Sequence, residues 1–328
     1  MYQMMSLPLY SGTFQEYDSW RDLGQELERL GCDGIEGVWG GEDLPKDLPA
    51  ELILGYHLIF YPDWLDFYRD DRAALKQKFG SLEAVASFYG GLGPDTLLEQ
   101  YRADLRRAVN LGARYVVFHV SDVSLEEGYT YRWLHTNQEV IDAAVEVVSL
   151  ILGEERWPFE FLVENQWWPG FTFTEPEETA RLLEGIRFAG KGILLDTGHL
   201  MNACTELKTE AEGADYIRSM LNRHGSLAKW VRGVHLHQSL SGAYVKAHTG
   251  SLPAGLPEDY MERFGVSYQH ILQIDQHRPW TDPAILPVLE QIEPRYLTHE
   301  LSSRGRMARA EAVSIQTRLL RQGGRMRV

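Results

Sequence analysis

The chain has 328 residues, 44% of them hydrophobic, so it can bury a large core as two ordinary domains or as one large α/β barrel. Its formal net charge of −15 disfavours a nucleic-acid partner, because duplex binding depends on several Lys or Arg contacts to phosphate.

Two further features concern the compartment. The longest apolar stretch, residues 143–152, is interrupted by a Glu and a Ser and is too short to cross a bilayer, and the N-terminus lacks the pattern of a secretory signal. Cys32 and Cys204 are the only cysteines and have no CxxC spacing, which is typical of a reducing compartment and argues against a thiolate zinc site. We expect a cytoplasmic protein with no membrane partner; the sequence leaves open whether it forms a homo-oligomer.

Short apolar runs with polar ends recur along the chain and read as strands. They lie at residues 4–12, 34–40, 52–60, 114–122, 159–166, 191–199, 231–239 and 295–303. Segments with helical period lie between them, at residues 17–31, 94–112, 134–153, 174–190 and 212–225. This alternation predicts an α/β protein, a (β/α)8 TIM barrel forming a single domain over residues 1–328. The alternative, a doubly wound open sheet, is disfavoured because no Gly-rich phosphate loop follows the first strand.

Two connections are longer than a barrel needs. Residues 62–96 contain a segment, 72–91, that predicts an extra helix, and residues 239–270 include a Gly, Ser and Pro-containing stretch, 241–260, that predicts an exposed loop. We interpret both as extended loops over the C-terminal face of the barrel.

Acids and histidines stand at the ends of the predicted strands. They are His57, His119, Glu164, Asp196, His199, His235, His237 and Glu300, and Asp275 and His277 lie between the last two strands. The strand ends of a parallel barrel converge, and carboxylates brought together there repel one another unless a cation binds. Every member is a nitrogen or oxygen ligand, so the pattern predicts a divalent-metal site. His299 faces the opposite side of its strand, and His135, His224, His248 and His270 are interpreted as structural.

The stretch LDTGH places Asp196 and His199 at the end of the most hydrophobic run. We expect Asp196 to direct its carboxylate at the pocket and Gly198 to supply the backbone angles of a tight turn, so that His199 faces the same point.

These residues resemble the xylose-isomerase-like TIM-barrel superfamily, over residues 34 to about 302, with DTGH and the flanking Glu positions as the most specific part. In the isomerase and epimerase branch, the matching positions Glu164, Asp196, His235 and Glu300 hold one divalent metal, and the position of His199 contacts substrate. In the abasic-site endonuclease branch, three zinc ions are held by the positions matching those five residues together with His57, His119, Asp275 and His277.

The sequence departs from these relatives in two places. Gln238 stands where many relatives carry an acid, and the Asp275–His277 pair lies farther from the seventh strand than in the endonucleases. The second departure bears on whether a third ion is held.

The resemblance implies either of two chemistries. In the first, the chain is a sugar, sugar-phosphate or polyol isomerase or epimerase using Mn, Co, Mg or Zn, in which Glu164 and Glu300 transfer a proton on a metal-bound substrate. In the second, it is a multinuclear zinc phosphodiesterase or endonuclease-like hydrolase.

Aromatic side chains near the predicted barrel mouth are suited to the C–H faces of a sugar. They are Trp39, Tyr61, Trp64, Trp167, Trp168, Phe171, Phe173 and Trp280. The sequence favours the isomerase or epimerase, with a small carbohydrate-like substrate bound by His57, His119, His199, Trp39 and Trp167. A metal-binding scaffold without catalysis is the third alternative.

Overall fold

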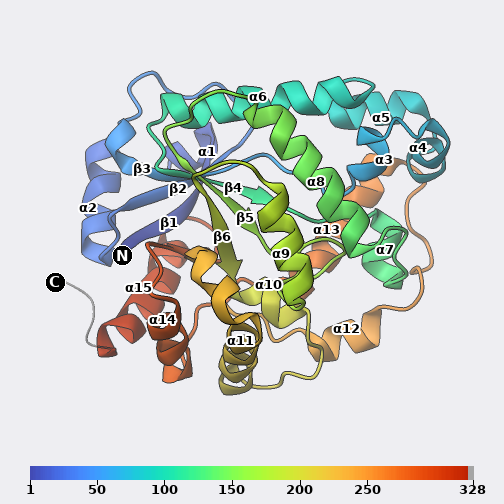
Figure 1. Cartoon of the computed structure of the whole chain (residues 1–328). Helices are drawn as coiled ribbons and strands as arrows, with labels where there is room; N and C mark the ends of the chain where they lie inside the picture. The colour runs from blue at the N-terminus through green and yellow to red at the C-terminus, as the bar shows by residue number, and fades with distance from the viewer. Residues whose placement is uncertain (324–328) are drawn as a thin grey trace.

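Eight parallel strands close into a barrel in the computed structural model, which describes residues 1–323 (Figure 1). Each strand pairs with the next one in sequence, and β8 pairs with β1. The strands are β1 (Tyr2–Leu9), β2 (Gly34–Trp39), β3 (Ile53–His57), β4 (Tyr115–His119), β5 (Glu160–Glu164), β6 (Lys191–Asp196), β7 (Val231–His235) and β8 (Tyr296–His299). Each strand overlaps one of the eight predicted apolar runs, so the predicted TIM barrel is confirmed.

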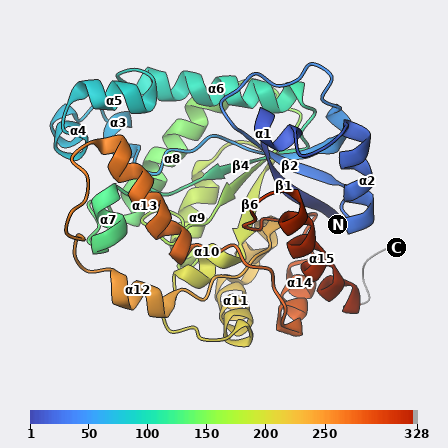
Figure 2. The same cartoon turned by 180° about the vertical axis from the view of Figure 1, so that it is seen from behind.

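Helices surround the barrel (Figures 1 and 2). They are α1 (Ser11–Phe14), α2 (Trp20–Leu30), α3 (Leu65–Tyr68), α4 (Arg72–Phe79), α5 (Leu82–Tyr89), α6 (Pro94–Asn110), α7 (Leu125–Thr130), α8 (Asn137–Leu152), α9 (Pro176–Gly185), α10 (Thr197–Asn202), α11 (Glu210–His224), α12 (Gly242–His248), α13 (Tyr260–Ile274), α14 (Leu286–Ile292) and α15 (Arg306–Gln322). Short 3-10 turns lie at η1 (Ala50–Leu52), η2 (Gly225–Trp230) and η3 (Pro283–Ile285).

Local sequence sets the ends of these helices. Thr136 and Thr209 form capping boxes at the starts of α8 and α11, and Pro94 occupies the first turn of α6, where its missing N–H costs nothing. Gly31 ends α2 in the left-handed conformation (φ 78°). Among the described residues, no helix is both long enough and apolar enough to cross a membrane.

Strand residues alternate between two apolar layers. Met4, Tyr115, Leu162 and Leu194 belong to a small buried cluster formed by strand residues, whereas Val116, Phe161 and Ile193 join the large cluster that includes the surrounding helices. Alternation of this kind follows from the two-residue period of a strand. The resulting rigid frame fixes the positions from which the strand ends project.

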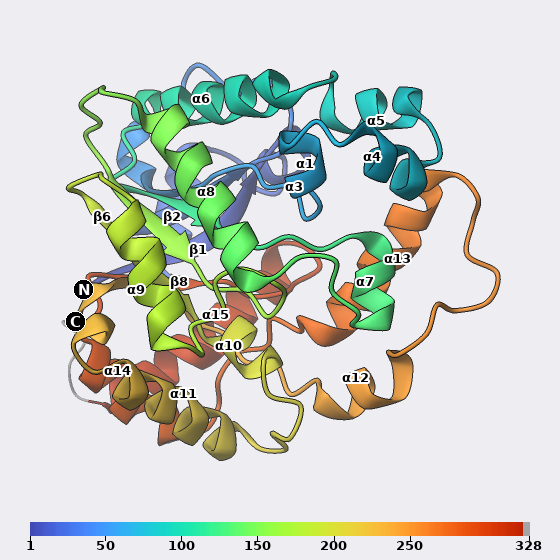
Figure 3. The same cartoon turned by 45° about the vertical axis from the view of Figure 1, so that its right-hand side comes forward.

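The long connections gather at one end of the molecule. Helices α3, α4, α5, α7, α12 and α13 all lie on the side opposite the N-terminus (Figure 3). The predicted helix over residues 72–91 is present as α4 and α5, which are separated at Gly80 (φ 85°). The prediction of a loop over residues 241–260 is wrong for residues 242–248, which form α12. Gly242 packs against the backbone of Thr205 too closely for any side chain, and Val245 is buried.

Candidate metal centre

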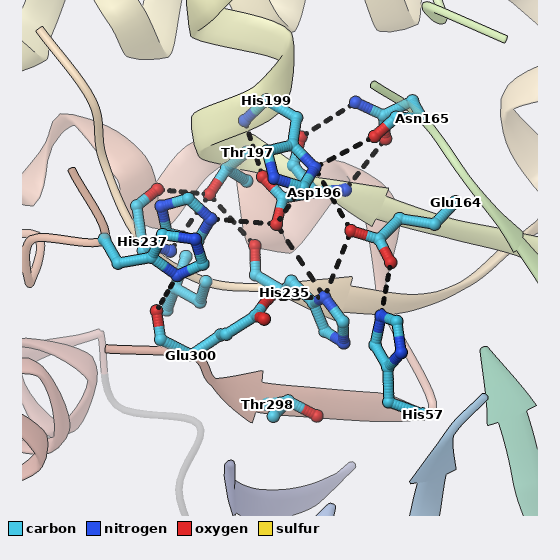
Figure 4. Close-up of polar contacts among 12 residues, drawn as sticks. His57, Glu164, Asn165, Asp196, Thr197, His199, His235, His237, Thr298 and Glu300 are labelled. Carbon is cyan, nitrogen blue, oxygen red and sulfur yellow. Dashed lines mark hydrogen bonds and ion pairs between the residues drawn. The ribbon is translucent and has the colours of Figure 1, made fainter. Parts of the chain in front are cut away.

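The ends of neighbouring strands carry the central ligand candidates in register. His119 pairs with Glu164 across β4 and β5, and Asp196 pairs with His235 across β6 and β7. Asn165 ties two of these strands together, because its side chain accepts a hydrogen bond from the Asp196 N–H (2.8 Å) and donates one to the Asp196 carbonyl (3.1 Å). The side chains of Glu164, Asp196 and His235 point toward one another at the barrel mouth (Figure 4).

His57, His119 and Glu164 form the first of three groups that could hold a metal ion. The Nε2 atoms of the two histidines lie 3.0 Å apart, and Glu164 Oε2 lies 3.3 Å from His57 Nε2 and 3.1 Å from His119 Nε2. The His57 ring is fixed from behind, because its Nδ1 contacts the Leu58 carbonyl at 2.8 Å.

Glu164, Asp196, His235 and Glu300 form the second group. His235 Nδ1 lies 2.7 Å from Glu300 Oε2, 3.4 Å from Glu164 Oε1 and 3.7 Å from Asp196 Oδ2. Glu164 is therefore shared with the first group, one oxygen facing each.

His199, His237, Asp275 and His277 form the third group. Asp275 Oδ2 lies 2.6 Å from His277 Nε2 and 3.2 Å from His199 Nε2, and the rings of His237 and His277 stack at 4.0 Å. His277 has a left-handed backbone (φ 46°), a strained conformation that is concentrated at functional sites. The insertion of α12 and α13 between β7 and Asp275 has not moved this pair away from the barrel mouth.

The ligand separations fit a bound cation. Four ligands about 2.1 Å from a tetrahedral ion lie about 3.4 Å from one another, close to the separations in these groups. Glu164 Oε1, His235 Nδ1, His237 Nδ1, Asp275 Oδ1 and Glu300 Oε2 are buried and have no hydrogen-bond partner among the described residues, although opposite charges lie close to several of them. Unpaired buried groups of this kind are costly unless a cation binds them. The imidazole and carboxylate donors suit Zn, Mn, Co or related divalent ions.

The charge state of the site also suits a cation. Burial raises the pKa of Glu164, but the neighbouring imidazoles of His119 and His235 outweigh it and hold the pKa well below its usual range. Burial lowers the pKa of His277, but the Asp275 carboxylate outweighs it and raises the pKa to about 10. Without a metal, protons on histidines therefore neutralise the carboxylates, and a metal ion would displace those protons.

Asp196 has two functions in the local structure. Its Oδ1 accepts a hydrogen bond from the His199 N–H (2.6 Å) and caps the short helix α10, while Oδ2 accepts from His237 Nε2 (2.8 Å). The expected reason for Gly198 is wrong. Gly198 does not adopt a positive φ, and a Cβ there would lie 2.0 Å from the His237 ring. The glycine is needed because the histidine packs directly against the backbone.

Sequence reasoning missed Glu36, which lies beneath His235 inside the barrel. Glu36 is fully buried, and its Oε1 lies 2.8 Å from His235 Nε2. Its Oε2 accepts hydrogen bonds from the hydroxyls of Tyr115 (2.6 Å) and Thr298 (3.0 Å). A carboxylate on the far nitrogen of a ligand histidine fixes its tautomer and ring orientation. Glu36 is the one acidic residue of the apolar run 34–40, and an acid inside a predicted strand was the signal that could have identified it.

A cavity of about 520 Å³ opens above the three groups. His57, His119, His199, Asp275, His277 and Glu300 line its floor, and Trp167 and Trp168 line its wall. Trp39 is not among the lining residues; its indole donates to the Glu42 carbonyl (2.7 Å) and stacks against Arg107. Of the other predicted aromatics, Tyr61 lines the cavity, whereas Trp64, Phe171, Phe173 and Trp280 are buried in the core.

The histidines interpreted as structural have structural contacts. His299 is buried between Gln3 and Gln316, and burial lowers its pKa to about 3. His224 stacks on Phe173 in the helical layer. His270 holds α13 against α7 and α12, and its ring also lines the cavity.

Residues 25–293 match the family model described as xylose isomerase-like TIM barrel. The chain belongs to this family. Solved structures that share the fold include sugar-processing enzymes and an endonuclease. No curated protein sequence matches the chain.

Three of these solved structures include an endonuclease and enzymes of the sugar-processing kind. Endonuclease IV from Thermus thermophilus superposes with a TM-score of 0.54 at 16% identity, covering 98% of this chain and 100% of that one. A D-tagatose 3-epimerase-like protein gives 0.53 at 15% identity, covering 99% and 98%. Mannonate dehydratase from Streptococcus suis serotype2 gives 0.53 at 14% identity, covering 99% and 94%. At these identities the likeness shows the fold alone, so the function must be argued from the site.

Proposed function

We propose that this protein is a hydrolase of phosphoesters that depends on a cluster of three divalent metal ions. The observation that carries the proposal is the presence of three adjacent ligand groups, two of which share Glu164. A single-ion isomerase needs the second group only as a metal site, whereas a three-ion hydrolase uses all three groups as ligands.

Each group would hold one ion. Divalent ions bound there would activate water and neutralise the negative charge that develops on the phosphoryl oxygens. In the reaction, the water oxygen would form a bond to phosphorus, the bond from phosphorus to the leaving oxygen would break, and the proton lost by the attacking water would pass to the leaving oxygen, which departs as an alcohol. The residues of the chain fix the geometry of the groups.

The environment of Glu164 also supports hydrolysis over proton transfer. Its Oε2 faces His57 and His119, and its Oε1 lies 3.1 Å from His199 Nδ1. If ions bind the first and second groups, both oxygens of Glu164 are ligands and neither is free to take a proton from a substrate carbon.

The isomerase or epimerase favoured by the sequence is the second candidate, and one observation supports it. Glu300 keeps one-fifth of its side chain exposed in the cavity while sharing the second group with Glu164. In this alternative only the second group holds an ion, and His57, His119 and His199 bind substrate oxygens.

A substitution at His199 separates the two candidates. We expect His199→Gln to lose one ion per chain and most of the hydrolysis of bis(p-nitrophenyl) phosphate, measured by metal analysis and absorbance. His248→Gln, an exposed histidine far along α12, is the control. If His199→Gln keeps the full metal content, and the wild type converts members of a ketose and polyol panel but not the phosphodiester, the protein is the isomerase or epimerase.

A further inference from the structure

The cavity above the metal groups has a roof that a bare barrel would lack. Helix α13 crosses the mouth beside α7 (Figures 2 and 3). The two helices are joined by His270, whose Nε2 contacts the Gly128 carbonyl at 3.2 Å and whose ring stacks on Tyr129 at 4.3 Å. The roof therefore belongs to the ordered structure around the cavity.

The residues of the cavity wall and roof are mainly aromatic and aliphatic. They are Val38, Phe60, Tyr61, Phe88, Val123, Leu125, Tyr129, Trp167, Trp168, Phe264, Tyr268, Ile271 and Leu272. No Lys or Arg is among the lining residues, and the carboxylates that line the cavity, Asp275 and Glu300, belong to the metal groups. The chamber therefore offers no cation for a second anionic group placed away from the metal floor.

Several polar side chains of the wall are engaged within the protein. Gln166 Nε2 lies 3.0 Å from His199 Nδ1, and the Ser124 hydroxyl caps α7. Both ring nitrogens of His270 have partners, and the Tyr61 hydroxyl donates to Gln100. Trp167 Nε1, Trp168 Nε1 and Ser267 Oγ are buried and have no hydrogen-bond partner among the described residues. A sugar would bring several hydroxyls into this chamber, whose mainly apolar lining offers few polar atoms to bond them, and hydroxyls left unpaired are unfavourable.

Two aromatic side chains are exposed although they line the chamber. Phe60 is 48% exposed and its ring packs 4.5 Å from that of His119, next to the first metal group. Tyr268 on the roof is 53% exposed. Large apolar side chains left open beside a polar site are typical of ligand pockets, whose size range includes a cavity of 520 Å³.

We propose that the substrate is a small phosphoester with one anionic phosphoryl group on an aromatic or otherwise apolar body, and not a sugar phosphate or a nucleic acid. Only the position of the phosphoryl group in this inference rests on the proposed function; the position of the apolar body rests on the cavity lining. The phosphoryl group lies on the metal floor, and the apolar body fills the chamber under α13 against Phe60 and Tyr268.

Binding of unreactive phosphonates to the metal-loaded protein tests this substrate class by calorimetry. We expect phenylphosphonate to bind at least about tenfold more tightly than methylphosphonate, because the ring is removed from water. Glucose 6-phosphate should bind no better than methylphosphonate. Equal affinities for the two phosphonates, tighter binding of the sugar phosphate, or no phosphonate binding would overturn the proposal.

Two substitutions locate the apolar body. Tyr268→Ala and Phe60→Ala should each lower the affinity for phenylphosphonate about threefold to tenfold and leave the affinity for methylphosphonate nearly unchanged. Met261→Ala is a matched control, since Met261 lies on the same helix as Tyr268 and is equally exposed (52%) but does not line the cavity. No selective effect on phenylphosphonate would contradict the proposed position.

The outcomes separate this inference from the proposed function. Selective phenylphosphonate binding without hydrolysis of any phosphoester would retain the apolar chamber and reject the hydrolase. Metal-dependent hydrolysis that is insensitive to the apolar group and to both alanine substitutions would retain the hydrolase and reject the substrate class.

Discussion

The second and third metal groups reach the same point from different kinds of structure. Glu164, Asp196 and His235 end strands of the closed barrel and are fully buried, so the hydrogen bonds of the sheet set their spacing. Asp275 and His277 follow α13 in an insertion, where the His277 ring stacks on that of His237 and its Nδ1 contacts the Glu300 carbonyl at 3.0 Å. The comparison teaches that the closed barrel fixes the candidate ligands of the second group, whereas two ligands of the third group depend on the insertion that also covers the cavity. We therefore expect the third ion to be the most easily lost.

The largest effect should come from Glu164→Gln, which removes the carboxylate shared by two groups. We expect loss of two ions per chain and a fall in phosphodiester turnover of roughly 1,000-fold or more, because several kcal/mol of charge stabilisation disappear. Metal analysis and initial rates measure both. Glu177→Gln, an exposed glutamate in the first turn of α9, is the control and should match the wild type. Full metal content in Glu164→Gln would contradict the proposal that two ions share the Glu164 carboxylate.

Asp275→Asn tests the third ligand group. Its carboxylate joins His199 and His277, so we expect loss of one ion only, while the ions bound at Glu164 remain. Turnover should fall about 10- to 100-fold, less than for the shared carboxylate. The metal content is read by native mass spectrometry. Loss of all ions together would show that the two kinds of site are not independent.

Glu36→Gln should have a smaller effect, because Glu36 acts through His235. We expect the affinity for the central ion to fall about tenfold to 100-fold, the range found for a carboxylate behind a ligand histidine. Competition with a chromogenic chelator measures it. Tyr115→Phe keeps the Glu36 carboxylate and removes one of its hydrogen bonds, so it should reduce the affinity for the ion less than Glu36→Gln does. An unchanged affinity for the ion in Glu36→Gln would show that Glu36 contributes to packing and does not act on His235.

The smallest effect concerns His224, a buried histidine that belongs to none of the three ligand groups. Burial lowers the pKa of His224, so below the usual imidazole pKa of about 6.5 the unfolded chain binds a proton that the folded chain does not. Stability from this group is therefore present at neutral pH and lost as the pH falls. Denaturant unfolding at pH 7.5 and pH 5 should show a weaker pH dependence for His224→Gln than for the wild type. Equal pH dependence would mean that His224 titrates alike in both states.

Much of the barrel and of the metal centre could be predicted from the sequence, because both depend on local pattern. The strand runs have a clear apolar signal, and parallel strands bring their ends together, which places Glu164, Asp196 and His235 in one pocket. The helix of residues 242–248 escaped prediction because its glycine is required by contact with Thr205, a residue distant in sequence. Glu36 was missed for the same reason. Whether a side chain near a strand end faces the axis, the cavity or a neighbouring helix depends on tertiary contacts that one sequence does not reveal.

The presence of three metal ions is the central claim, and anomalous diffraction from crystals grown with zinc tests it most directly. We expect three peaks, one in each ligand group, with Glu164 bridging the ions of the first and second groups. A single peak among Glu164, Asp196, His235 and Glu300, with His199, Asp275 and His277 still bonded to one another, would contradict the claim and favour the isomerase or epimerase.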